Sequence, residues 1–192
     1  MFKLPSKVDL NSLINDMRTF CWEASEIMLY YAQILKDSSD KSNILKNNNN
    51  DDPVTLADLK VNELKIKRIN EKYINVEWEI LSEENVKVVP DNCDTNSDWL
   101  WILDPLDGTK DFIQGTSNYA MHLSLNYRQK PHIGIVLIPE KDELWFANGE
   151  KVWCEKRDGS LINPNLSKIK SPFMKLKILF DLKDLSSSLS FL

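Results

Sequence analysis

Cysteine is scarce in this chain, and its pattern excludes several classes of protein. The 192 residues include only Cys21, Cys93 and Cys154, which lie far apart and form no Cys-x-x-Cys pair. Zinc-binding modules and disulfide-rich secreted domains need cysteines at short, regular spacing. We therefore expect three reduced thiols in a cytoplasmic protein.

The sequence also lacks long apolar runs and an excess of basic residues. No run approaches the roughly 20 apolar residues that span a bilayer, and the N-terminus lacks the apolar core of a signal peptide. The formal net charge of −5 argues against nucleic acid as a partner, since a nucleic-acid backbone requires a basic face. Walker A, Gly-x-Gly-x-x-Gly and Gly-x-Ser-x-Gly motifs are missing too. We expect neither a membrane nor a nucleic acid as partner.

Hydrophobic periodicity predicts an α+β fold. Apolar residues three and four positions apart predict a helix over 8–36, capped by Asp9 or Asn11. Thr55 is the predicted cap of a second helix that ends near residue 72. Strands are predicted at 75–81, 99–103, 119–127, 132–138, 143–147 and 151–155, and polar loops at 37–52 and 85–98. Because short links join consecutive strands, we expect a mostly antiparallel sheet with two long helices packed on one face.

The most informative segment is the run WILDPLDGTKDF at residues 101–112. An apolar strand leads into Asp104, Pro105 is predicted to end that strand, and Asp107-Gly108 predicts a turn. Two carboxylates at the mouth of a buried strand are costly unless a cation neutralises them. Mg²⁺ takes oxygen ligands of this kind, so the run predicts a magnesium site.

Further acids precede this run at Asp58 and at Glu83-Glu84. If the strands that end at Glu83 and Asp104 lie side by side, these carboxylates converge with that of Asp107 and with the carbonyl of Leu106. Two Mg²⁺ ions held there would promote transfer of a phosphoryl group to water. For each acid a purely structural interpretation stays open: Asp58 as a helix-capping acid and Glu83-Glu84 as a solvated strand end.

Gly108 and Thr109 add a place for phosphate. Thr109 is predicted to begin a short helical turn, and the backbone N–H groups at such a start bind anions. The Thr109 hydroxyl would orient the attacking water, and a nearby carboxylate such as Asp58 would accept its proton. His122 and His132 are interpreted as core or surface residues, since no acid or thiol lies at suggestive spacing.

These residues resemble the inositol monophosphatase family of Mg²⁺-dependent phosphatases. Trp101–Phe112 matches the family's first signature, and Pro53-Val54-Thr55-x-x-Asp58 and Leu81-Ser82-Glu83-Glu84 match its two upstream motifs over about residues 8–155. The resemblance implies that Asp58 and Thr109 prepare the nucleophilic water and that Gly108 and Thr109 amides hold phosphate. It also implies four metal ligands: Glu83, Asp104, Asp107 and the Leu106 carbonyl.

Within the family, the motifs Leu-Ser-Glu-Glu and Asp-Gly-Thr-Lys-Asp-Phe-Ile look most similar to the 3′(2′),5′-bisphosphate nucleotidases, with inositol-phosphate phosphatase as the alternative. Family members continue into a second half that supplies a further metal-binding Asp, and no such motif is found here. We expect residues 1–158 to form the metal- and phosphate-binding domain and residues 159–192 to begin a truncated second domain. A catalytically inactive remnant that only binds metal or a partner is a further alternative, and a homodimer is possible under either reading.

Overall fold

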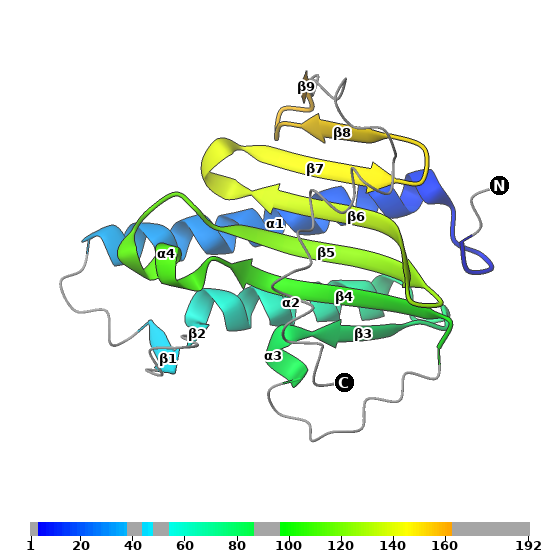
Figure 1. Cartoon of the computed structure of the whole chain (residues 1–192), viewed down its shortest axis with the longest axis horizontal. Coiled ribbons are helices and arrows are strands. Elements are labelled where there is room, and N and C mark those ends of the chain that lie inside the picture. Colours follow the sequence, from blue (N-terminus) through cyan, green and yellow to red (C-terminus); the bar gives the residue numbers. More distant parts are fainter. Residues whose placement is uncertain (1–3, 38–43, 48–53, 87–96, 163–192) are drawn as a thin grey trace.

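The structure is a computed structural model that describes residues 4–37, 44–47, 54–86 and 97–162. Its helices are α1 (Leu10–Asp37), α2 (Leu56–Lys72), α3 (Glu83–Val86), α4 (Thr109–Gln114) and the 3₁₀ helix η1 (Pro139–Lys141). Its strands are β1 (Leu45–Asn47), β2 (Val54–Thr55), β3 (Glu79–Ser82), β4 (Trp99–Asp107), β5 (Ala120–Tyr127), β6 (Lys130–Ile138), β7 (Glu143–Asn148), β8 (Val152–Glu155) and β9 (Leu161–Ile162). Figure 1 shows how these elements are arranged.

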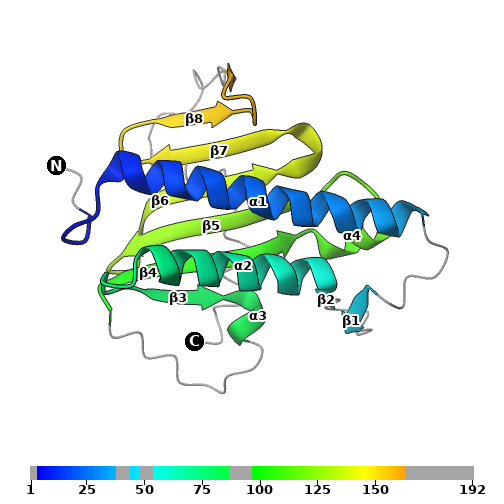
Figure 2. The same ribbon diagram turned by 180° about the vertical axis from the view of Figure 1, so that it is seen from behind.

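Seven strands form one sheet in the order β3-β4-β5-β6-β7-β8-β9, and β1 pairs with β2 apart from it. All neighbours in the large sheet are antiparallel except β3 and β4, which run parallel. Seen from behind, α1 and α2 both lie across the same face of this sheet (Figure 2). The prediction of an α+β fold with two long helices on a mostly antiparallel sheet is confirmed.

Both long helices begin next to the capping residues that the sequence indicates. The Asp9 carboxylate accepts a hydrogen bond from the backbone N–H of Ser12 at 2.8 Å, so Asp9 caps α1. Thr55 caps α2, and its hydroxyl accepts a hydrogen bond from the backbone N–H of Ala57 at 3.1 Å. These caps satisfy backbone donors that the first turn of a helix leaves without partners.

Two predicted strands differ most from the structure, each by four residues at one end. The strand predicted at 75–81 begins only at Glu79, because the N–H of Val76 donates to the carbonyl of Tyr73 and turns the chain after α2. The strand predicted to stop before Pro105 continues to Asp107. Its register against β5 shifts between Asp104 and Asp107, and proline is tolerated at such a bulge because no ladder N–H is needed there.

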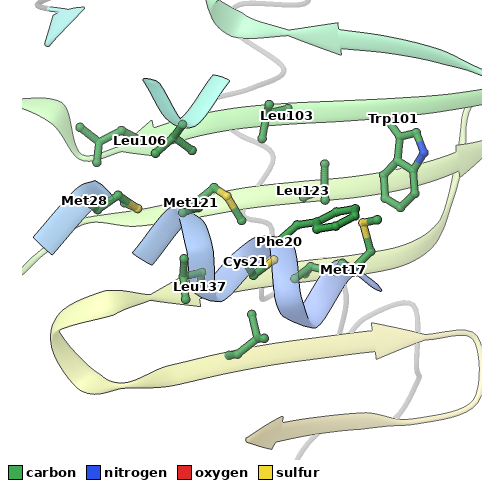
Figure 3. Close-up of a cluster of buried hydrophobic side chains, with 14 of the residues drawn as sticks. Met17, Phe20, Cys21, Met28, Trp101, Leu103, Leu106, Met121, Leu123 and Leu137 are labelled. Atoms are coloured by element: carbon green, nitrogen blue, oxygen red, sulfur yellow. The ribbon is translucent and has the colours of Figure 1, made fainter. Parts of the chain in front are cut away.

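The core lies between the sheet and the two helices. Side chains of α1 interlock with those of β4, β5 and β6, as Figure 3 shows. Each large apolar side chain that is fully buried, such as Trp101, Met17 or Leu123, contributes about 1.5–3 kcal/mol of transfer free energy. This layer fixes the positions of α2 and β4, the elements that carry most of the predicted site residues.

Some predictions fall outside the described residues. They include most of the loops at 37–52 and 85–98 and nearly all of the predicted second domain at 159–192. Within the described ranges, no helix is long and apolar enough to cross a bilayer.

Candidate active site

The parallel pairing of β3 and β4 brings two acidic motifs to one edge of the sheet. Ser82 at the end of β3 pairs with Leu103 in β4, so the next residues, Glu83 and Asp104, follow at the same level. The two strands therefore lie side by side, which is the condition on which convergence of these acids depended. Figure 1 shows the two strands running together toward α3 and the start of α4.

Asp104 is a carboxyl group that is only 7% exposed. Burial, the negative charges of Glu83 and Asp107, and a hydrogen bond with Glu83 together raise its pKa to about 9. The backbone N–H of Leu106 donates to Asp104 at 3.1 Å, which favours the charged form but does not offset the other effects. Three carboxyl groups thus share a site with too little positive charge to keep them all ionised.

The excess of negative charge among these three carboxyl groups indicates whether a metal ion fits the site. The donors are carboxylate oxygens and backbone carbonyls, which are the ligands of hard cations. A divalent cation would neutralise the charge that raises the pKa of Asp104. As they stand, no three His, Cys, Asp or Glu side chains among the described residues are arranged to hold a metal ion. The donor chemistry therefore fits Mg²⁺, although the ligands are not gathered into a finished coordination shell.

Asp58 lies in the first turn of α2 and is 3% exposed. Its Oδ2 accepts the backbone N–H of Thr55 at 2.9 Å and the hydroxyl of the same residue, which completes a capping box. The pKa of Asp58 is raised to about 7, chiefly by burial; the hydrogen bonds from Thr55 reduce the rise, and the charge of Glu84 adds to it. The capping interpretation of Asp58 is correct, and it occupies only one of the two carboxylate oxygens.

The other oxygen of Asp58 faces Thr109. The Thr109 hydroxyl lies 3.4 Å from Asp58 Oδ1 and 2.9 Å from the carbonyl oxygen of Leu106. A hydroxyl has one proton, so Thr109 donates to one of these acceptors at a time. Three predicted site residues from α2, β4 and α4 are thereby joined in one hydrogen-bonded group.

Gly108 makes the turn between β4 and α4 possible. Its φ is +81°, in the left-handed region, and a Cβ atom there would lie 2.5 Å from the carbonyl oxygen of Asn118. Only glycine meets both conditions without displacing backbone. α4 begins at the next residue, Thr109, as predicted.

A separate cavity of about 1040 Å³ lies at the opposite ends of β3 and β4. Aromatic side chains line it, among them Trp78, Trp99 and Tyr127. It does not include any of the predicted site residues. The predicted site residues therefore lie at the carboxyl ends of these strands, away from the cavity.

Comparison with known proteins decides the family. The sequence profile of the inositol monophosphatase family matches residues 9–180, which is most of the chain. This chain belongs to the inositol monophosphatase family. The resemblance inferred from the three acidic motifs is confirmed. Members of the family are phosphatases that generally depend on metal ions and act on small phosphorylated substrates.

Individual relatives agree with this assignment. The 3′(2′),5′-bisphosphate nucleotidase CysQ of Salmonella typhimurium is 30% identical over 108 residues, which are 55% of this chain and 42% of that protein. The extragenic suppressor protein suhB from Bartonella henselae superposes with a TM-score of 0.60 at 21% identity, over 77% of this chain and 52% of that one. An IMPase/NADP phosphatase complexed with NADP and Ca²⁺ gives a TM-score of 0.57 at 19% identity, over 76% and 49%. The chain spans about half the length of these relatives.

Two residues of this inositol monophosphatase family chain lie at the site although the family resemblance assigned them no catalytic, metal-binding or phosphate-binding role. Glu84 is 9% exposed, and its charge acts on Asp58. His122 pairs with Asp104 across the sheet, and its Nε2 lies 3.9 Å from Asp107 Oδ2. Sequence spacing could not indicate this contact, because Asp107 lies on the neighbouring strand; the interpretation of His122 as a core or surface residue stays a prediction.

Proposed function

We propose that this chain is a Mg²⁺-dependent phosphomonoesterase whose preferred substrate is a 3′(2′),5′-bisphosphate nucleotide such as adenosine 3′,5′-bisphosphate. The observation that carries the proposal is the group formed by Asp58, Thr109 and Leu106 beside the carboxyls of Glu83 and Asp104. The nucleotide substrate class is supported by CysQ, the nucleotidase that is 30% identical over 108 residues.

In the proposed site, Glu83, Asp104, Asp107 and the carbonyl of Leu106 hold the metal ions. Bound Mg²⁺ lowers the pKa of a coordinated water and stabilises negative charge on the phosphoryl oxygens. This role accounts for a cluster of carboxyls, one of them the buried Asp104, that is electrostatically unfavourable without a cation.

The remaining residues prepare water and phosphate. Thr109 holds the attacking water through its hydroxyl, and Oδ1 of Asp58, the oxygen that faces Thr109, accepts a proton, directly or through Thr109. A pKa of about 7 suits Asp58 to proton transfer near neutral pH. The backbone N–H groups of Gly108 and Thr109, at the start of α4, bind a phosphoryl oxygen.

The test is phosphate release by the purified chain, with adenosine 3′,5′-bisphosphate and inositol 1-phosphate as parallel substrates, in Mg²⁺ and in a chelator. We expect Mg²⁺-dependent release that is faster with the nucleotide. Faster release from inositol 1-phosphate would instead support the alternative of an inositol-phosphate phosphatase. A folded chain that releases phosphate from neither substrate would contradict the proposal and support a role limited to binding.

An inactive variant separates this activity from a contaminating phosphatase. Asp58→Asn keeps an oxygen that accepts the N–H of Thr55, so α2 retains its cap while the proton acceptor is lost. Asp98→Asn changes an exposed acid that pairs with Arg128 and serves as the matched control. Activity that survives in Asp58→Asn at the level of Asp98→Asn would show that the measured phosphatase is not this site.

A further inference from the structure

Lys65 has a fully buried side chain, which is rare for lysine. It lies on α2, and its Nζ stands 3.3 Å from the Sγ of Cys21 on α1, which is fully buried as well. The ring of Phe20 lies 6.0 Å from the same nitrogen. Among the ion pairs found within the described residues, none includes Lys65.

This pair is not explained by packing alone. A buried amine with a thiol as its hydrogen-bond partner is less favourable than an apolar side chain of the same length would be. Burial raises the pKa of the Cys21 thiol, the charge of Lys65 lowers it, and the charge of Glu155 raises it. Two nucleophilic atoms, one nitrogen and one sulfur, therefore face each other at close range in a site shielded from water.

We propose that Cys21 and Lys65 are the two ends of an oxidation-dependent covalent cross-link, in which a single oxygen atom bridges Sγ and Nζ. The oxidant is dioxygen, a small apolar molecule that can enter a protein core. The site lies within the layer between α1 and the sheet, and Figure 3 shows Cys21 among the side chains of this layer. The proposal does not depend on the proposed phosphatase activity.

The reaction balances for the uncharged thiol–amine pair and equally for the thiolate–ammonium pair, which contains the same atoms. Sulfur and nitrogen carry three hydrogens between them. Two of these leave, and one stays on nitrogen. One oxygen atom of dioxygen forms the new S–O and O–N bonds, and the other leaves as water with the two lost hydrogens. Sulfur and nitrogen each give up two electrons, and dioxygen accepts four.

The cross-link would join α1 to α2 over a sequence separation of 44 residues. Closing a loop of this length restricts the unfolded chain and so stabilises the folded one. It would also fix α2, whose first turn carries Asp58, against α1. Oxidation at Cys21 and Lys65 would thus act on the fold between the helices rather than on the acidic residues themselves.

Mass spectrometry of the full chain tests the proposal. After incubation in oxygen-saturated buffer we expect a mass gain of about 14 Da, one oxygen atom gained and two hydrogens lost, whereas a simple sulfenic acid adds about 16 Da. Protease digestion should yield one linked product that contains both Cys21 and Lys65, and a thiol reductant should reverse the change. A folded chain that keeps a free thiol at Cys21 and a free amine at Lys65 would overturn the proposal.

Three variants locate the reaction. Lys65→Met replaces the amine with an apolar side chain of similar length and should abolish the gain, as should Cys21→Ser. Cys154→Ser removes another buried free thiol and should leave the gain unchanged. Oxidation should raise the thermal midpoint of the wild-type chain and not that of Lys65→Met. A gain of about 14 Da that persists in folded Lys65→Met would overturn the assignment to this pair.

Discussion

The Thr109 hydroxyl lies 3.4 Å from Oδ1 of Asp58, while Oδ2 of the same carboxylate caps α2 through Thr55. One carboxylate thus joins the start of α2 to the start of α4. One oxygen of Asp58 thus has the structural role, and the other has the proposed chemical role, so mutation can separate the two.

Thr109→Val should abolish most of the proposed activity and leave the fold intact. Valine has nearly the same shape but cannot hold water or exchange a proton with Asp58, so kcat should fall roughly 10²- to 10⁴-fold. Thr109→Ser keeps the hydroxyl and should retain most of the activity. Steady-state kinetics with both variants provides the measurement. Equal activity of the Val and Ser variants would show that the hydroxyl takes no part.

Asp104→Asn should stabilise the metal-free chain at alkaline pH. The folded chain holds a proton on Asp104 up to about pH 9, whereas an unfolded chain releases it near pH 4. Between these values the folded state binds more protons than the unfolded state, so stability falls as the pH rises. Asparagine removes the charge, so the variant should be more stable by about 1–3 kcal/mol at pH 8 and should show a flatter pH dependence.

Denaturant unfolding in a chelator at pH 5 and pH 8 measures this difference. A matched control is Asp107→Asn, because Asp107 is the more exposed member of the cluster and should have a smaller effect. Mg²⁺ should stabilise the wild-type chain more at pH 8 than at pH 5, since its ligands are more fully ionised there. An Asp104→Asn variant with the same stability profile as the wild-type chain would refute this electrostatic account.

Gly108→Ala should destabilise the chain more than Gly159→Ala. Both glycines have φ near +80°, but an added Cβ at Gly108 meets the Asn118 carbonyl at 2.5 Å, whereas nothing lies within 4 Å at Gly159. Gly159→Ala should cost about 1 kcal/mol from backbone strain alone. Gly108→Ala should cost about 3 kcal/mol or more, because the backbone must also move. Thermal unfolding of the two variants measures the difference, and equal losses would contradict the close approach.

Local signals in the sequence predicted the helices and strands. The features that they did not predict depend on pairing between segments that lie far apart in the chain. The capping box of Thr55 and Asp58 lies within four residues, so its residues alone indicated the start of α2. The passage of β4 through Pro105 depends on a bulge opposite β5 and could not be deduced from proline in isolation. The approach of His122 to Asp107 likewise depends on cross-strand register.

The same distinction applies to the acids of the site. The family motifs identified Glu83, Asp104 and Asp107, but they could not show how strongly the charges interact, because pKa depends on burial and on neighbours from other elements. Glu84 illustrates this limit. In the sequence it is the second of two adjacent acids, yet in the structure it is nearly buried and acts on Asp58 in α2.

Glu84→Gln should lower the pKa of Asp58. The charge of Glu84 disfavours ionisation of Asp58, so its removal makes the proton easier to lose and moves the pKa down from about 7. Carbon-detected NMR titration of the metal-free chain measures this pKa, and the acidic limb of the proposed activity should move to lower pH in the same direction. Glu63→Gln, on the exposed side of α2, is the control and should leave both unchanged. If the pKa of Asp58 is the same in Glu84→Gln and Glu63→Gln, then burial and the Thr55 hydrogen bonds alone set it, and Glu84 is not part of the site's electrostatics.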